Sequence, residues 1–303
     1  MDERMIIQQL INGITLGSIY ALIALGYTLV YGILRLINFA HSEIFMIGAF
    51  AAVGVLSLPQ IQTSSLSLQL ISALSAGILC SAVTAYGVER LAYRPLRAAS
   101  RLAPLISAMG VSIFLQNAVF LLISNQSVPF PEIGAFHSIN LGIFKLNSLQ
   151  MFIIGLSLFL MFALQLFIQK TRIGKAMRAT AADRPTAELL GIPTNTIISL
   201  TFIIGGALGG AAGVLNGMYY GSIRYNMGFF PGIKAFTAAV LGGVGSIAGA
   251  VIGGFLLGIL ESIAAGLIPG GSEWKDIFSF IILILVLTLR PQGLLGEKSA
   301  DKV

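Results

Sequence analysis

The chain has 303 residues, of which 56% are apolar and only 10% charged, and its mean hydropathy is +0.91. Soluble globular domains carry about 25% charged residues, so this composition excludes a soluble fold and indicates a polytopic membrane protein. The net charge of +6 fits cytoplasmic loops beside anionic lipid rather than nucleic-acid binding, and the single cysteine, Cys80, excludes an internal disulfide.

Apolar runs predict the membrane-crossing elements in chain order. They cover residues 5–33, 42–58, 67–89, 102–124, 149–168, 196–219, 230–244, 246–268 and 277–290. A hydrocarbon core of about 30 Å takes about 20 helical residues, so 42–58, 230–244 and 277–290 are short, and some are predicted to be half-helices or re-entrant. We therefore predict an all-α polytopic membrane protein with eight to ten transmembrane or half-spanning helices in a single domain over residues 1–303.

Basic residues predict which helix ends face the cytoplasm. They cluster at residues 90–101, 170–184 and 290–302, whereas the segment 125–147 holds two prolines and a single base and is predicted to be external. Two alternatives stay open for the N-terminus. It lies outside if all nine runs span, and inside if one run before Arg90 is re-entrant.

Two short segments resemble each other: NFAHSEIFMIGA at 38–49 and GFFPGIKAFTAA at 228–239. Each has a polar or helix-breaking start followed by a short apolar helix. If all nine runs span, the two segments run in opposite directions, as in transporters built from inverted repeats. The match is loose, so an inverted repeat and a chance likeness are both open.

Glycine recurs every fourth residue at two places, in 205–221 and in 245–253. A four-residue step drifts only about 40° around a helix, so these glycines form a shallow groove that lets another backbone approach closely. Tight packing within one subunit is the first interpretation, and a subunit interface or a moving helix contact is the alternative.

Few ionisable residues fall inside the apolar runs, and such residues usually face a cavity or a partner. Glu43 begins a short run, where it either caps the positive end of its helix or contacts substrate or a gate. Lys234 follows a helix start that disfavours a cation, so we predict snorkelling, an ion pair with Glu43 or a role in the path. Glu261 is expected at the membrane interface, and Gln116-Asn117 are expected to form interhelical hydrogen bonds, with path lining as the alternative. The candidate path or gate residues are Asn38, His41, Ser42, Glu43, Gln116, Asn117 and Lys234.

A polar block interrupts the apolar pattern at about residues 169–195. Five Lys and Arg residues fall between Lys170 and Arg184, with Asp183 and Glu188 beside them. Each charge costs about 2.5–3.5 kcal/mol in the hydrocarbon core on insertion scales, so the block must project from the membrane, on the cytoplasmic side. A hairpin between two spans needs only a few residues, so we expect a partner to dock on this loop.

Motifs for catalysis are absent from the sequence. There are no paired cysteine ligands and no H-E-x-x-H, and the two histidines are His41 and His137, which argues against a catalytic metal. The pair Gly174-Lys175 lacks the earlier glycine and the hydroxyl residue of a P-loop, so we expect no ATPase site in this chain and no cofactor.

Several motifs, in order along the whole chain, resemble LivH-type permeases of branched-chain amino acid ABC importers. They are INGITLGSIYAL at 11–22, NFAHSE at 38–43, ERLAYRPLR at 89–97, AELLGI at 187–192, KAFTAAVLGG at 234–243 and RPQGLLG at 290–296. The resemblance implies a multi-pass permease domain over residues 1–303. It would translocate branched-chain (hydrophobic) amino acids across the bacterial inner membrane.

The resemblance also implies partners. These are a second related permease, expected to form a heterodimer, two cytosolic ABC ATPases and an extracytoplasmic substrate-binding protein, besides the lipid bilayer and with no nucleic acid. The polar block would hold the coupling helix in an ATPase cleft through Arg178, Asp183, Arg184, Ala187, Glu188, Leu190 and Gly191.

Two alternatives remain for the function. One is a permease of the same family for urea or other amino acids. The other, in a different class, is a stand-alone channel or secondary carrier in which Glu43 and Lys234 serve ion coupling; the polar block without any P-loop argues against it.

Overall fold

Helices make up most of the chain in the computed structural model, which describes residues 3–97, 99–100, 102–134, 138–140, 145–267, 271–289 and 292–295. The α-helices are α1 (Glu3–Leu34), α2 (His41–Leu56), α3 (Pro59–Gln62), α4 (Leu66–Val88), α5 (Leu102–Leu122), α6 (Ser148–Lys170), α7 (Arg172–Ala182), α8 (Arg184–Leu189), α9 (Thr194–Tyr220), α10 (Phe229–Gly242), α11 (Ile247–Leu267) and α12 (Gly271–Leu289). A π-helix, η1 (Glu89–Tyr93), and a 3₁₀-helix, η2 (Arg94–Leu96), continue α4.

Two short antiparallel strand pairs accompany the helices. Strand β1 (Val128–Pro129) pairs with β4 (Ser222–Ile223), with Val128 opposite Ile223. Strand β2 (Ser138–Asn140) pairs with β3 (Lys145–Asn147), with Ser138 opposite Asn147. Both pairs lie outside the apolar runs, so the prediction of a helical membrane protein is confirmed.

Helix lengths separate the elements into two sets. Six of the described helices are long and apolar enough to cross a membrane: α1, α4, α5, α6, α9 and α11. Helices α2 and α10, with 16 and 14 residues, are shorter, as their sequence runs predict. The last run is longer than expected, because α12 already begins at Gly271 and has 19 residues.

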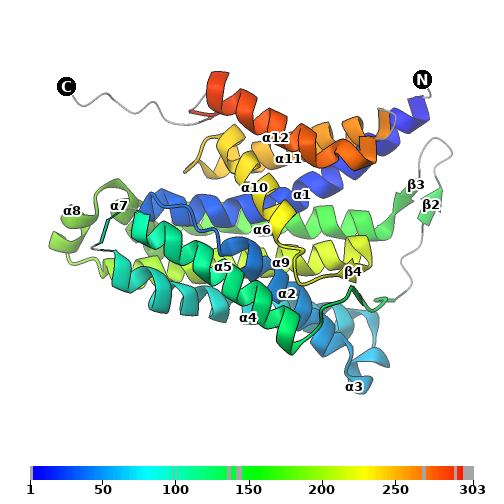
Figure 1. Cartoon of the computed structure of the whole chain (residues 1–303), viewed down its shortest axis with the longest axis horizontal. Helices are drawn as coiled ribbons and strands as arrows, with labels where there is room; N and C mark the ends of the chain where they lie inside the picture. Colours follow the sequence, from blue (N-terminus) through cyan, green and yellow to red (C-terminus); the bar gives the residue numbers. More distant parts are fainter. Residues whose placement is uncertain are drawn as a thin grey trace.

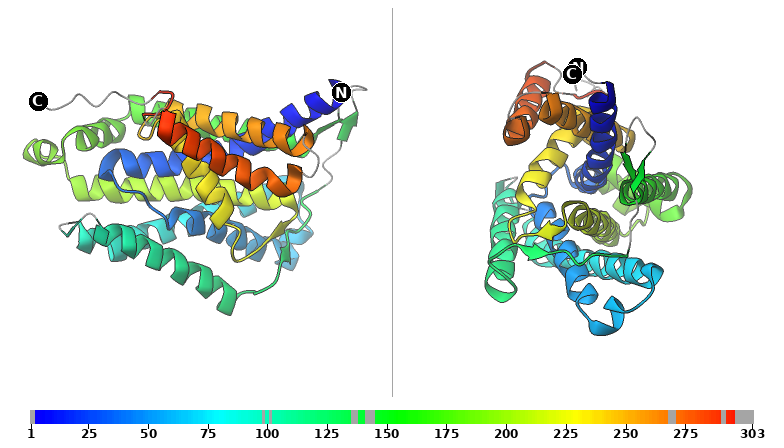
Figure 2. Two further views of the ribbon diagram at one scale, coloured as in Figure 1. Left: turned by 45° about the horizontal axis from the view of Figure 1, so that its top comes forward. Right: turned by 90° about the vertical axis from the view of Figure 1, so that its right-hand side faces the viewer.

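Helices α1 and α9 form the centre of the bundle. Figures 1 and 2 show the other helices around them, with α5 and α12 at the periphery. Most of α1 and α9 is buried, whereas α4, α5 and α6 expose large apolar side chains such as Val83, Leu121 and Phe159. In a bilayer lipid tails would cover such faces without cost, while backbone groups stay paired inside the helices.

The helix contacts support the inverted-repeat hypothesis. Helix α1 packs against α11 and α10, and α9 packs in the same way against α4 and α2, while α2 packs on α4 as α10 packs on α11. Exchanging α1, α2 and α4 with α9, α10 and α11 therefore preserves the pattern of contacts. The short helices α2 and α10 run in opposite directions in Figure 1, as an inverted repeat requires.

The two ends of the bundle differ in character. Figures 1 and 2 place the start of α1 at the end opposite to α7 and α8. The basic segment around Arg97 lies at the same end as α8, because its side chain hydrogen-bonds Asn195 at the start of α9. The start of α1 therefore lies opposite the basic segments around Arg97 and at 170–184, which favours the alternative in which the N-terminus lies on the other side of the membrane from these segments.

Glycines of α9 allow three helices to pack at close range. A Cβ at Gly213 would overlap the Phe45 carbonyl of α2, and a Cβ at Gly210 would lie 2.6 Å from Ser81 Oγ of α4. Across the same seam, a Cβ at Gly48 would lie 2.5 Å from the Cα of Gly210. The predicted glycine groove is therefore a packing seam within this subunit.

Gly213→Leu is expected to prevent correct packing of α2 on α9, because Leu would clash with backbone that cannot move as a flexible side chain can. We expect loss of most of the monodisperse protein on purification in detergent. Ile204→Leu, a change of equal volume on the same helix, is the control and should leave the yield nearly unchanged. A normal yield for Gly213→Leu would contradict the packing seam.

Candidate cavity and coupling surface

The starts of the two short helices lie side by side. A Cβ at Gly232 of α10 would lie 2.5 Å from the Cβ of Ser42 in α2, and a Cβ at Gly228 would overlap the Ser42 carbonyl. The starts of α2 and α10 therefore converge within the bundle. This convergence depends on glycine at both positions, because a side chain there would push α10 away from α2.

A cavity of about 550 Å³ opens beside this junction. Its walls come from α2, α5, α10 and α12, together with Tyr27 of α1. Most of the lining is apolar, and the polar side chains among it are few. The lining residues are Tyr27, Phe39, Ser42, Glu43, Met109, Ser112, Ile113, Gln116, Phe229, Gly232, Ile233, Phe236 and Leu283. Such a size and polarity are typical of sites for small ligands.

Glu43 is the one charged side chain among the described residues of this lining. It lies in the first turn of α2, where the helix dipole favours an anion, and only 2% of its surface is exposed. Its Oε1 accepts a hydrogen bond from Ser112 Oγ of α5 at 3.3 Å, whereas Oε2 has no hydrogen-bond partner. Among the described residues it forms no ion pair.

Two other sequence candidates, Asn38 and His41, lie near the start of α2 and contact neighbouring helices. Asn38 Oδ1 accepts hydrogen bonds from the Ala40 N–H at 3.2 Å and from Tyr93 Oη at 3.1 Å, which fixes the turn before α2. His41 is buried between Gly26 and Gly209, with its ring edge-on to Tyr27 at 4.8 Å. Neither side chain is among the described residues that line the cavity.

The adjacent Gln116 and Asn117 differ in environment. Gln116 is part of the cavity lining. Asn117 is exposed on α5 and donates to the Ile113 carbonyl of its own helix at 2.8 Å, instead of forming the expected interhelical hydrogen bond. The two side chains point apart because successive helical residues are about 100° apart around the axis.

Of the three alternatives for Lys234, the ion pair with Glu43 is wrong. Lys234 Nζ lies 2.6 Å from Glu261 Oε1 of α11 and 2.6 Å from Asp276 Oδ1 of α12. Glu261, which we expect near the membrane interface, has an exposed fraction of only 2% because neighbouring helices cover it. Lys234 points away from the α2–α10 junction and ties together α10, α11 and α12.

Tyr20 of α1 completes this charged cluster. Its hydroxyl lies 3.3 Å from Glu261 Oε1, and the Lys234 ammonium lies 5.7 Å from the centre of its ring. Sequence reasoning missed Tyr20 and Asp276 because both lie far from Lys234 along the chain. The sequence did offer one signal. The dipole at the start of a helix disfavours a cation, so Lys234 in that position indicates a buried acidic partner.

The polar block folds into α7 and α8. Asp183 ends α7 and caps α8, accepting from the Thr186 N–H at 3.4 Å and from its hydroxyl at 2.6 Å. Helix α8 ends where the Gly191 N–H donates to the Glu188 carbonyl, and a φ of 79° at Gly191 explains why glycine stands there. Arg178 is exposed and donates to the Ile168 carbonyl near the end of α6, so its side chain also anchors α7.

Helix α8 has a buried and an exposed side. Ala187 is buried, whereas Leu190 is 75% exposed and Leu189, which sequence reasoning missed, is 88% exposed. The Arg184–Glu188 ion pair, 3.1 Å long, also lies on the surface. Hydrogen bonds from Thr194 and Arg184 lower the pKa of Glu188.

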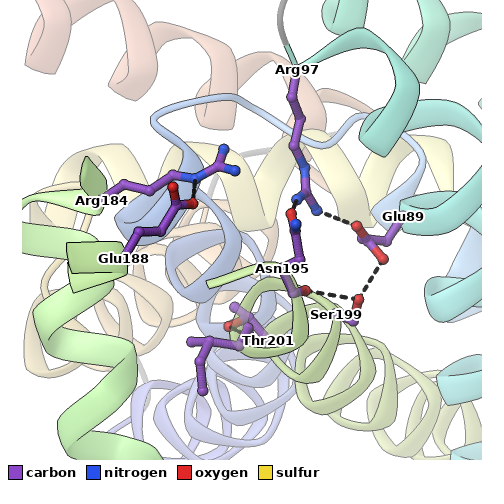
Figure 3. Close-up of polar contacts among 8 residues, drawn as sticks. Glu89, Arg97, Arg184, Glu188, Asn195, Ser199 and Thr201 are labelled. Carbon is purple, nitrogen blue, oxygen red and sulfur yellow. Dashed lines mark hydrogen bonds and ion pairs between the residues drawn. The ribbon is translucent and has the colours of Figure 1, made fainter. Parts of the chain in front are cut away.

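A polar network anchors the start of α9 beside α8. Figure 3 shows Arg97 between Glu89 and Asn195, and Ser199 donating to the second oxygen of Glu89 at 2.6 Å. Thr194, the first residue of α9, donates a hydrogen bond from its hydroxyl to the Glu188 carboxylate of α8. The segment after α4 and the helix α8 therefore both attach to the first turn of α9.

The six long apolar helices, with the charged helices α7 and α8 at one end, define a multi-pass membrane protein. The chain belongs to the family described as branched-chain amino acid transport system / permease component, whose model matches residues 9–287.

Relatives of the chain are similar over nearly their whole length. It is 47% identical to the high-affinity branched-chain amino acid transport system permease protein BraD of Pseudomonas aeruginosa, with 98% of each chain covered. It is 46% identical to the permease protein LivH of the corresponding system in Escherichia coli K12, covering 98% of this chain and 97% of LivH. A chain of PsaBC from Streptococcus pneumoniae in complex with Fab aligns over 94% of this chain and 91% of its own, at 11% identity and a TM-score of 0.47, which is too distant to support a statement about function.

Proposed function

We propose that this chain is a membrane-spanning permease subunit of an ABC importer that translocates branched-chain amino acids. The observation that carries this proposal is the identity of 46–47% with BraD and LivH over 98% of the chain. The chain would act as a translocation subunit and not as an enzyme. Energy would come from two cytosolic ABC ATPases, substrate from an extracytoplasmic binding protein, and the second half of the path from a related permease in the bacterial inner membrane.

The surface proposed for ATPase docking is the exposed side of α8. Its two neighbouring leucines, Leu189 and Leu190, lie 88% and 75% exposed on a helix surrounded by charged residues. An apolar pair in such a place gains most from burial in a protein cleft. The capped ends of α8 and its attachment to α9 would make it a rigid contact, so that a movement of the ATPases reaches the spanning helices.

Leu189→Ser and Leu190→Ser are expected to weaken ATPase association by about ten- to hundredfold each, because burial of a leucine contributes about 1.5–3 kcal/mol. The measurement is retention of the ATPases when the tagged permease is purified at falling concentration, together with leucine uptake into proteoliposomes of the whole complex.

Leu122→Ser is the matched control, because Leu122 is 83% exposed and ends α5 at the opposite end of the bundle. Normal ATPase retention by both α8 variants would contradict the docking surface. Leucine uptake by the chain without ATP and ATPases would instead favour a stand-alone carrier, and uptake of urea without leucine would favour the related permease class.

A further inference from the structure

We propose that Glu43 determines substrate specificity by accepting the α-ammonium group of the transported amino acid. The branched side chain would lie against the apolar walls of the cavity between α2, α5, α10 and α12. This inference rests on the proposed function and names the chemistry by which this subunit recognises its substrate.

Comparison with the other buried acids shows what is unusual about Glu43. Three glutamates are buried among the described residues: Glu43, Glu89 and Glu261. Glu89 forms an ion pair with Arg97, and Glu261 forms one with Lys234. Glu43 alone of the three has no cationic partner in the described part of the chain, although a buried charge is costly unless it is paired.

The carboxylate of Glu43 lies beside a space that a ligand can enter. Ser112 holds Oε1, while Oε2 remains without a hydrogen-bond partner in a side chain that lines the cavity. A primary ammonium donates up to three hydrogen bonds and carries the missing positive charge. Glu43 lies in the first turn of α2, where the helix dipole favours the anionic carboxylate. The dipole does so without a hydrogen bond to Oε2.

The rest of the lining fits an apolar side chain. Aromatic surface comes from Phe39, Phe229 and Phe236, and aliphatic surface from Ile113, Ile233 and Leu283. A volume of about 550 Å³ is ample for one branched-chain amino acid. The described lining contains no Lys, Arg or His, so the substrate carboxylate would meet neutral donors there, among them the amide of Gln116.

The test is a charge-selective labelling experiment on the full complex. Cys80 is replaced by alanine, and Ile113→Cys in the cavity wall supplies the only thiol of this chain. We expect the cationic aminoethyl methanethiosulfonate to react faster than the anionic sulfonatoethyl reagent by roughly tenfold or more, relative to their rates with a free thiol in solution. Glu43→Gln should remove this preference, whereas Glu43→Asp and the exposed control Glu132→Gln should retain it.

A ligand-protection experiment tests recognition of the ammonium group with Glu43 unchanged. Its result is therefore valid even if the Glu43→Gln variant fails to assemble. Excess leucine should slow labelling at Ile113→Cys, and 2-hydroxy-4-methylpentanoate, which lacks the ammonium, should not. Three results would each overturn the inference. The first is equal protection by both compounds, and the second is an unchanged reagent preference in Glu43→Gln. The third is a thiol that never reacts because a partner permease closes the cavity.

Leucine uptake separates this inference from the proposed function. In proteoliposomes of the whole complex, Glu43→Gln should lower uptake by roughly ten- to hundredfold, as for loss of a hydrogen bond to a charged group. Full uptake by Glu43→Gln would overturn the role of Glu43 and leave the proposed function intact. No leucine uptake by the unmodified complex would overturn the proposed function itself.

Discussion

Lys234→Met is expected to destabilise the permease by about 3–5 kcal/mol, because it leaves two carboxylates without their shared cation. Glu261 is 2% exposed and cannot regain water, and Asp276 lies 2.6 Å from the same ammonium. Helices α10, α11 and α12 would lose their common contact. The measurement is the midpoint of thermal unfolding of the purified protein in detergent, together with the yield of monodisperse protein.

A double-mutant cycle separates the ion pair from general damage. Glu261→Gln in the Lys234→Met background should recover part of the loss, because it removes the stranded charge. Glu43→Gln in the same background should simply add its own effect, since Glu43 does not contact Lys234. Recovery by Glu43→Gln and not by Glu261→Gln would contradict the ion-pair assignment.

Arg97→Met is expected to have a comparable effect, about 3–5 kcal/mol, at the other end of the bundle. It strands Glu89, which is fully buried, and removes the 2.6 Å hydrogen bond to Asn195 in the first turn of α9. Since α8 also attaches to this turn, we expect lower ATPase stimulation in the protein that still folds. Thermal unfolding and the ATP hydrolysis rate of the complex measure the two effects.

Arg90→Met is the matched control, because Arg90 follows Glu89 directly and its side chain is exposed. It should change neither the unfolding midpoint nor ATP hydrolysis. The effects of Arg97→Lys should fall between those of Arg90→Met and Arg97→Met, since lysine keeps the charge and loses the forked hydrogen bonds to Glu89 and Asn195. Equal effects of Arg90→Met and Arg97→Met would contradict a specific buried pair.

Local patterns in the sequence were sufficient to predict the long apolar helices of the fold. A run of about 20 apolar residues can satisfy its backbone in a bilayer as a helix, so the positions of the long apolar helices follow from the sequence pattern alone. The short lengths of α2 and α10 and the solvated block at 169–195 follow in the same way. Glu43 at a helix start was a sound candidate because intramembrane acids are costly without a role.

Only the tertiary structure decided which side chains meet. Lys234 pairs with Glu261 and Asp276 rather than with Glu43, because the direction in which α10 leaves its junction with α2 turns this lysine toward α11 and α12. The position of Glu261 in its own run suggests the membrane interface, yet neighbouring helices bury it. Helical periodicity fixes the face on which a side chain lies, whereas its partner depends on how helices cross, and residues remote in the sequence control those crossings.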